Sequence, residues 1–170
     1  SGIIPRYSWY ALGVILAANT LNYLDRSILH ILAPAIIEDM QLDDAQMGFL
    51  MGTAFAIFYA VVGIAMGRIA DALQRTRVMA VGLAIWSAMT AFGGMSSSLA
   101  MLGAARMGVG TGEPTATPCG QALIAEYFPP KKRATALSIN MTGSFLGTAG
   151  AMIIGGLFLE HWDSWCGGMG

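Results

Sequence analysis

Four charged residues lie inside long apolar stretches of the sequence, Asp25 and Arg26 in the first stretch and Arg106 and Glu113 in a later one. A carboxylate can take up and release a proton, and a guanidinium can bind an anion. If the stretches cross a membrane, each charge costs roughly 2.5 to 3.5 kcal/mol when it faces lipid. We therefore expect the four residues to face a protein interior or a wet cavity, on the pathway of a substrate or a proton. The alternative is that they form ion pairs that only hold helices together.

Polar residues accompany these charges at helical spacing. On a helix of 100° per residue, the polar positions of the later stretch fall within about 80°, and the first stretch carries a similar stripe. Asp25 is rotated by about 100° from Arg26 and lies nearest Asn22. The stripes comprise Arg106, Gly110, Glu113, Thr117 and Gln121, and Asn19, Asn22, Tyr23, Arg26 and His30. With two acids and two bases, the two helices should thus share a nearly neutral interior. His30 is a weaker candidate, because a lone histidine is more often a satisfied polar group than a functional one.

The composition is typical of a membrane protein. Of 170 residues, 55% are hydrophobic and 11% are charged, whereas soluble domains carry about 25% charge. A helix needs about 20 apolar residues to cross a hydrocarbon core of about 30 Å. We expect an all-α integral membrane protein with five spans, near residues 10–32, 47–67, 78–95, 99–125 and 134–159.

The basic residues outside the expected spans all fall on one side if the spans alternate. They are Arg6, Arg68, Arg75, Arg77, Lys131, Lys132 and Arg133. The opposite connections, EDMQLDDAQ and EHWDSW, contain acids but no lysine or arginine. The positive-inside rule therefore predicts a cytoplasmic N-terminus. Because span flanks account for these charges, no nucleic-acid partner is expected.

The glycine-rich stretch RMGVGTGEPTATPCG, residues 106–120, does not predict a nucleotide site. It lacks both the strand that precedes a dinucleotide fingerprint and the Gly-Lys-Ser/Thr end of a P-loop. Glycines in a span instead permit close helix packing, and prolines permit bending. The expected packing positions are Gly108, Gly110 and Gly112 in this stretch, and Gly143, Gly147 and Gly150 on one face of the last span.

The remaining reactive residues predict no metal, cofactor or catalytic centre. Cys119 and Cys166 have no spacing that is typical of a disulfide framework or a metal site. No serine-histidine or paired-aspartate arrangement occurs at a useful spacing, so an intramembrane enzyme is the least favoured class. The chain is predicted not to be an enzyme.

The connection GRIADALQRTRV, residues 67–78, resembles the loop signature Gly-x-Leu-x-Asp-Arg-x-Gly-Arg-(Arg/Lys) of the major facilitator superfamily. The sequence keeps this pattern at Gly67, Ile69, Asp71 and Arg75, and departs from it at Ala72, Gln74 and Thr76. In that family the loop latches the two halves of the transporter in the outward-facing state. The resemblance implies a cytoplasmic latch formed by Gly67, Asp71, Arg75 and Arg77.

Two further stretches resemble the bacterial spinster-like branch of this family: NYLDRSIL, residues 22–29, and ARMGVGTGEPTATPCGQALIAEYFPPKKRATALSI, residues 105–139. The resemblance implies a proton-coupled secondary transporter of a lysolipid or sphingosine-phosphate-like anion, working by alternating access in the bacterial inner membrane. Its partners would be the substrate, protons and the lipid bilayer, without a cofactor. Asp25 and Glu113 would couple protons. The substrate-binding residues would be Arg26, Arg106, Asn22, Tyr23 and Thr117.

Members of this family have twelve spans in two halves, and five are expected here. We therefore interpret residues 1–170 as a truncated N-terminal transporter domain, five helices of the N-terminal six-helix bundle, without the sixth span and the C-terminal half. One alternative is a small organic anion:proton symporter, which also carries Asp-Arg-like motifs in its first span. A second is a non-transporting membrane module or partial gene product.

Overall fold

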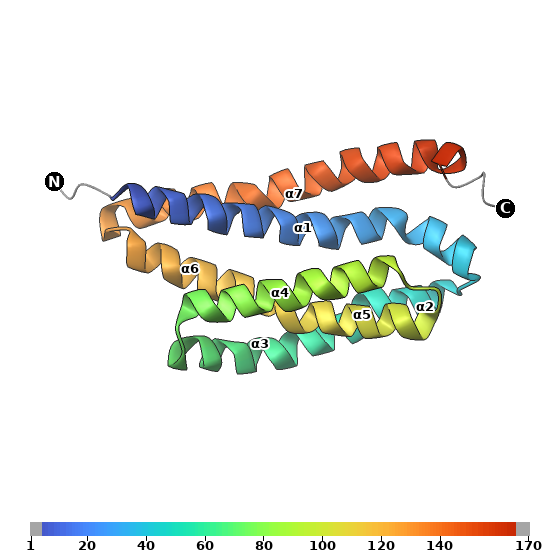
Figure 1. Ribbon diagram of the computed structural model, residues 1–170, viewed down its shortest axis with the longest axis horizontal. Coiled ribbons are helices and arrows are strands. Elements are labelled where there is room, and N and C mark those ends of the chain that lie inside the picture. The colour runs from blue at the N-terminus through green and yellow to red at the C-terminus, as the bar shows by residue number, and fades with distance from the viewer. Residues whose placement is uncertain (1–4, 166–170) are drawn as a thin grey trace.

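The computed structural model describes residues 5–165, apart from the side chains of residues 54, 70, 71 and 162–165, and that part of the chain is helical without any strand. Figure 1 shows the helices running side by side along the long axis of the molecule. Their bounds are α1 (Arg6–Met40), α2 (Asp44–Gly48), η1 (Phe49–Ala54), α3 (Phe55–Ala72), α4 (Arg75–Gly94), α5 (Leu99–Gly112), η2 (Glu113–Thr115), α6 (Ala116–Tyr127) and α7 (Pro130–Trp165).

These elements form five helical rods, because α2, the π-helical turn η1 and α3 follow one another without a break, as do α5, the 3₁₀ turn η2 and α6. Each range expected to span the membrane falls within one rod, to within one residue at the end of α4. By length and composition, three helices of the described part could cross a membrane: Asp44–Ile69, Arg75–Gly94 and Pro130–His161. The other two rods are the ones that carry the buried charges. Polar residues such as Asn19 and Asn22 dilute the apolar character of α1, and η2 divides the fourth rod into shorter helices.

Local sequence explains where the rods begin and end. α1 ends at Gln41, whose left-handed backbone lets its N–H bond to the carbonyls of Glu38 and Ile37. The side chain of Asp43 caps α2. α4 follows Gln74, whose φ of −65° suits any residue, so this turn does not need the glycine that the family signature has there. Phe128 is extended, as expected for a residue before proline, and α6 ends there.

The connections lie at the two ends of the bundle. Figure 1 shows the start of α1, the α3–α4 connection and the α6–α7 connection together at one end, which we call the basic end. The α1–α2 and α4–α5 connections lie at the opposite, acidic end. The alternation of the rods therefore places the basic residues listed above at one end, as the positive-inside argument requires.

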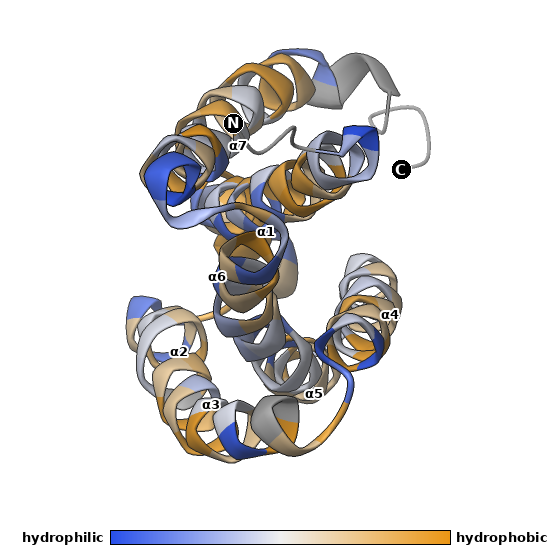
Figure 2. Ribbon diagram, turned by 90° about the vertical axis from the view of Figure 1, so that its left-hand side faces the viewer, coloured by the Kyte–Doolittle hydropathy of each residue, from blue (hydrophilic) through white to orange (hydrophobic). Residues whose placement is uncertain are grey.

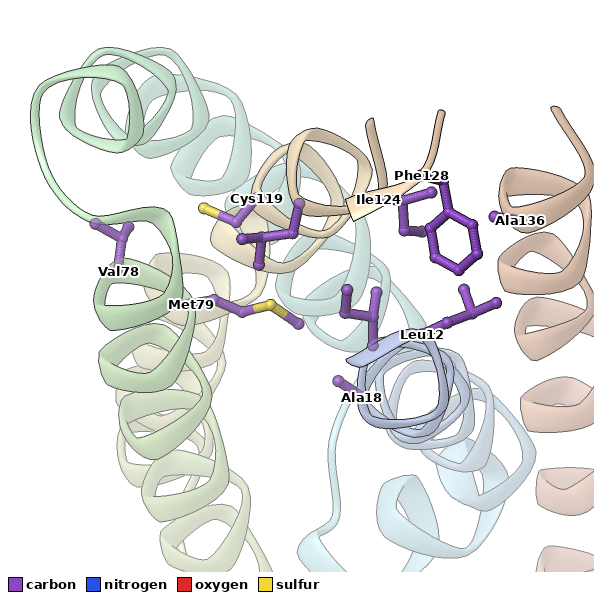
Figure 3. Close-up of a cluster of buried hydrophobic side chains, with 10 residues drawn as sticks. Leu12, Ala18, Val78, Met79, Cys119, Ile124, Phe128 and Ala136 are labelled. Carbon is purple, nitrogen blue, oxygen red and sulfur yellow. The ribbon is translucent and has the colours of Figure 1, made fainter. Parts of the chain in front are cut away.

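A buried apolar cluster packs α1, α4, α6 and α7 together toward the basic end (Figure 3). A smaller cluster of Met47, Leu50 and Leu102 joins η1 and α5 toward the acidic end. Many large apolar side chains also point outward, among them Val61, Ile64 and Phe145, and Figure 2 shows hydrophobic residues on the outer sides of the rods. A hydrophobic exterior is expected for a chain that faces lipid. The larger cluster consists of Leu12, Ile15, Ala18, Val78, Met79, Cys119, Leu123, Ile124, Phe128 and Ala136.

Two glycines allow unusually close helix crossings. A Cβ atom at Gly147 of α7 would collide with the carbonyl oxygen of Thr20 in α1, and one at Gly112 would lie 2.5 Å from the carbonyl oxygen of Gly82 in α4. Gly108 and Gly143 also have neighbours within 3.0 Å of such an atom, whereas the nearest atoms at Gly110 and Gly150 lie at 3.5 Å. Of the six expected packing glycines, four are therefore tight and two have ordinary room.

Candidate functional site

The four interior charges meet in two ion pairs between α1 and the fourth rod. Arg26 Nη2 lies 2.5 Å from Glu113 Oε2, and Arg106 Nη2 lies 3.9 Å from Asp25 Oδ2. The pairs cross, because adjacent residues of α1 pair with residues on successive parts of the fourth rod. Glu113 has 1% of its side chain exposed and Arg26 has 36%. The expected charge cluster thus exists, with one acid fully enclosed and one base partly open.

The 3₁₀ turn η2 sets the position of Glu113. Pro114 lacks a backbone N–H, and the Thr115 hydroxyl donates to the carbonyl oxygen of Gly112 at 2.7 Å, so the polar groups of the turn are satisfied locally. A 3₁₀ turn advances about 120° per residue instead of 100°. Both halves of the polar stripe expected along residues 106–121 lie against α1, at two separate small spaces. Arg106 and Glu113 are buried, whereas Thr117 and Gln121 are exposed.

Thr117 and Gln121 instead face a second polar region nearer the basic end. Together with Asn19 and Tyr23 of α1 and Asn140 of α7, they line a small space of about 40 Å³. Asn19 Nδ2 donates to the carbonyl oxygen of Asn140 at 2.8 Å, and this bond links α1 to α7. The expected substrate residues Tyr23 and Thr117 are thus brought together, although apart from the ion pairs.

Helix α4 supplies two donors to Asp25 that the sequence analysis missed. Trp86 Nε1 donates to Asp25 Oδ2 at 3.2 Å, and Thr90 Oγ1 donates to the same oxygen at 3.3 Å. Trp86 is buried, with 4% of its surface exposed. The signal was the spacing of four between the two residues, which places both on one face of the third span.

Two aromatic rings hold Arg26, and they were also missed. The guanidinium carbon of Arg26 lies 5.3 Å from the ring centroid of Phe55 and 5.1 Å from that of Tyr59. Both distances are within the range of a cation–π interaction. Phe55 directly follows the π-helical turn η1, a feature often found near functional sites. Arg26 therefore has an acid on one side and an aromatic pair on another.

Polar groups of the cluster remain incompletely satisfied. Among the described residues, four buried side-chain atoms have no hydrogen-bond partner: Arg26 Nε, Arg106 Nε, Glu113 Oε1 and Asn140 Oδ1. Three of the four belong to the ion pairs. Unpaired polar atoms inside a protein are uncommon and costly. Their concentration at the ion pairs therefore marks this cluster as a candidate functional site.

A cavity of about 350 Å³ opens beside the Arg106–Asp25 pair, between α1, α4, α5 and the end of α7. Asp25, Thr90 and Arg106 provide polar groups to its lining, and most of the rest is apolar. A second space, of about 20 Å³, touches Arg26, His30 and Glu113. Arg106 borders both spaces. The apolar lining of the larger cavity includes Ile28, Leu29, Leu32, Ile36, Met40, Leu102 and Phe158.

The remaining predicted site residues lie outside this cluster or at its edge. Asn22 is buried, with 6% of its surface exposed. Arg75 pairs with Glu126 across 3.8 Å at the surface of the basic end, and Arg77 is exposed. Gly67 has open space among the described residues where its Cβ atom would be. The side chain of Asp71 lies outside the described residues, as does Cys166, and the latch stays a prediction.

No group of three or more metal-ligating side chains occurs among the residues that the structure describes. Asp25 and Glu113 are held by arginines, which compete with any cation for their oxygens. The arrangement suits the exchange of protons and anions.

Comparisons with known proteins agree with this geometry. A model of the Major Facilitator Superfamily matches residues 15–167. The chain is 37% identical over 156 residues to an MFS-type efflux pump of Mycolicibacterium smegmatis, which covers 92% of this chain and 36% of that protein. It is 30% identical over 132 residues to a hexuronate transporter of Bacillus subtilis, and this match covers 78% of this chain and 31% of that protein.

A solved structure gives the same result for the fold. It is a bacterial homologue of the human lysosomal transporter spinster in an inward-facing, unoccupied conformation, with a TM-score of 0.87 and 38% sequence identity. The match covers 92% of this chain and 33% of that one, so the chain spans about a third of the length of the relatives it matches. The chain therefore belongs to the major facilitator superfamily, in its spinster-like branch, and forms five helices of the N-terminal half of that fold.

Proposed function

We propose that this chain is the N-terminal part of a proton-coupled secondary transporter that moves an amphipathic anionic lipid by alternating access. The observation that carries the proposal is the pair of crossed ion pairs, Arg26 with Glu113 and Arg106 with Asp25, in the interior of a membrane bundle. Buried ion pairs seldom add net stability compared with apolar packing. Two of them with unsatisfied atoms favour a role in exchange over a purely structural one.

The pairs link proton binding to anion binding. When Glu113 or Asp25 takes up a proton, its arginine loses a negative partner and becomes available to an anionic headgroup. Proton uptake therefore strengthens anion binding, and by reciprocity a bound anion favours proton uptake. Because Arg26 also rests on Phe55 and Tyr59, it keeps its position while its partner changes. Phosphate oxygens suit a guanidinium, which can bind them in a bidentate manner.

The larger cavity supports an amphipathic substrate. Its lining combines the polar residues Asp25, Asp39, Thr90, Ser96 and Arg106 with mostly apolar side chains. An anionic headgroup near Arg106 could thus be accompanied by an acyl chain along apolar side chains, as expected for a lysophospholipid or a sphingosine-phosphate-like molecule. Asn22, Tyr23 and Thr117 remain candidate contacts for substrate closer to the basic end.

The test is transport by the full-length protein in liposomes with an imposed pH gradient and a fluorescent lysophospholipid. Asp25→Asn and Glu113→Gln should each abolish stimulation by the gradient, whereas Asp44→Asn, which changes an exposed acid at the acidic end, should not. If both interior variants keep pH-dependent transport, the coupling assignment is wrong. If no lysophospholipid moves under any gradient, the substrate class is wrong.

The second candidate substrate is a small organic anion. The similarity to a hexuronate transporter favours it, because that protein is named for a small carboxylate sugar. Arg26 and Arg106 would bind a carboxylate as well as a phosphate. Competition in the same liposomes separates the two: hexuronate should leave lysophospholipid uptake unchanged under the first proposal and inhibit it under the second.

The proposal also assigns surroundings and partners. The N-terminus would lie in the cytoplasm and the protein in the bacterial inner membrane, with residues 67–78 latching this half to the C-terminal half. Labelling of single cysteines at Arg6 and Asp44 with a membrane-impermeant maleimide in intact spheroplasts tests the orientation. Only Asp44→Cys should react before the membrane is opened, and the reverse pattern would contradict the topology.

A further inference from the structure

The two acids of the site differ in the donors that surround them. A single oxygen of Asp25, Oδ2, accepts hydrogen bonds from Trp86 Nε1 at 3.2 Å and Thr90 Oγ1 at 3.3 Å, and it faces Arg106 Nη2 at 3.9 Å. Glu113 has one strong partner, Arg26, and its second oxygen is buried without a hydrogen-bond partner among the described residues. The two acids therefore differ in kind: Asp25 has neutral donors beside it, and Glu113 has a charged one.

Both donors to Asp25 come from α4, a helix that carries no charge of the site. An indole N–H can only donate, and an ionised carboxylate is a stronger acceptor than a protonated one, so Trp86 stabilises the ionised form of Asp25 more than the protonated form. A hydroxyl can donate or accept, and Thr90 donates here. Trp86 also lies at the tight crossing between α4 and the fourth rod, where it approaches Gly112. Packing thus fixes the indole against the carboxylate.

We propose that Trp86 and Thr90 are positioning residues that hold Asp25 in its ionised form and set the pH at which it takes up its proton. The inference deepens the proposed function, on which it rests for the importance of Asp25. It also makes the acids unequal, because among the described residues the neutral donors of α4 reach Asp25 and not Glu113.

Other charged groups around Asp25 act alongside these donors. Arg106 of α5 favours the carboxylate, and Glu113 of η2 opposes it. On α1 itself, Arg26 is the adjacent residue and Asp39 lines the same cavity. Helix α7 contributes Phe158, an apolar side chain, to that cavity. Tyr59 of α3 and His30 of α1 lie on the Arg26 side of the cluster. Within the part of the chain that the structure describes, the donors to Asp25 that can be removed without changing any charge come from α4.

The experiment is a pH titration of the fluorescence of Trp86 in the full-length protein, obtained as the difference between the protein and its Trp86→Phe variant. The emission should titrate, and Asp25→Asn should abolish that titration. Thr90→Val removes one hydrogen bond to a charged group, which should move the midpoint to higher pH by about one unit. Thr90→Ser keeps the hydroxyl and should restore the midpoint. Thr111→Val, which removes a hydroxyl bonded only to its own helix, is the matched control.

The outcomes separate this inference from the proposed function. An unchanged midpoint in Thr90→Val, or a titration that survives Asp25→Asn, overturns the inference. The titration needs no substrate, so it supports the inference even if liposomes show no proton-coupled transport, a result that would sink the proposed function alone. In a transport-competent protein, Thr90→Val and Trp86→Phe should both move the pH profile of uptake upward. Trp9→Phe should not, because the Trp9 ring meets Phe128 edge to face at the basic end, away from Asp25.

Discussion

Helix α1 presents two contrasting faces. Toward α7 it is packed against glycines, and backbone approaches backbone so closely that Gly147 has no room for a Cβ atom. Toward η2 and α5 it presents Asp25 and Arg26, whose partners leave several buried polar atoms unsatisfied. The first face gains stability from close packing, whereas the second is less stable because it buries charges and incompletely bonded polar atoms. Close backbone packing thus ties α1 to α7, and the polar groups without partners lie on the charged face.

The largest expected effect breaks the packed face. Gly147→Leu would drive a side chain into the backbone of Thr20, and no rotamer relieves a clash that begins at Cβ. We expect little folded protein, measured as the monodisperse yield in mild detergent. Gly156→Leu is the matched control, because Gly156 lies on the same helix with open space around it. If both variants give equal yields, the packed face is not a tight contact.

The next effect breaks the charged face. Arg26→Ala leaves the buried carboxylate of Glu113 without its cation, which should cost about 3 kcal/mol of stability, in line with other broken buried pairs. Adding Glu113→Gln removes the stranded charge and should recover most of the loss. The midpoint of thermal unfolding in detergent measures both variants, and Lys131→Ala at the exposed basic end is the control. A double variant as unstable as Arg26→Ala would show that the charge is not the cause.

A smaller effect marks the limit of the packed face. Gly150 has its nearest neighbour, Leu24 Cδ1, at an ordinary contact distance of 3.5 Å. Gly150→Ala should therefore fit and raise stability by about 0.8 kcal/mol, because alanine is the better helix former. The same thermal unfolding experiment checks the sign. A loss of stability would mean that the tight contact with α1 extends along α7 as far as Gly150.

The smallest effect tests the aromatic support of Arg26. Phe55→Leu keeps an apolar side chain and removes the ring face, which should cost about 0.5 kcal/mol of stability at this partly exposed site. It should also weaken anion binding, since the guanidinium loses part of its fixed position. Phe58→Leu changes a neighbouring ring that makes no such contact with Arg26, and is compared in the same unfolding and binding measurements. Equal effects of the two would assign the loss to packing alone.

Hydropathy predicted the five rods, and the cost of placing a charge in lipid predicted that the interior charges would lie together. Spacing on one helix predicted that Arg106 and Glu113 face α1, and the structure confirms that they meet Asp25 and Arg26. Spacing alone does not reveal which base pairs with which acid. That choice depends on where two helices cross, and the crossing is fixed by distant contacts such as Gly112 against Gly82.

Local changes of helical winding were not predicted from the sequence. The 3₁₀ turn at Glu113 is one, and beyond it Thr117 and Gln121 line a separate small space with Asn19 and Tyr23. The π-helical turn before Phe55 was not anticipated, and with it the ring face offered to Arg26 was missed. The sequence analysis also missed Trp86 and Thr90, because a side-chain donor can be assigned a role only when its acceptor on another helix is known.

The division of the fourth rod bears on how the protein enters the membrane. Segments are inserted during synthesis according to their own hydrophobicity. Length and composition single out neither α1 nor the interrupted α5–η2–α6 rod as a membrane span, yet these two carry the opposite charges that neutralise each other. Because each of these rods carries charges that the other neutralises, we expect the two to depend on each other in the bilayer. A mutation of one charge should then lower the amount of protein that accumulates in the membrane.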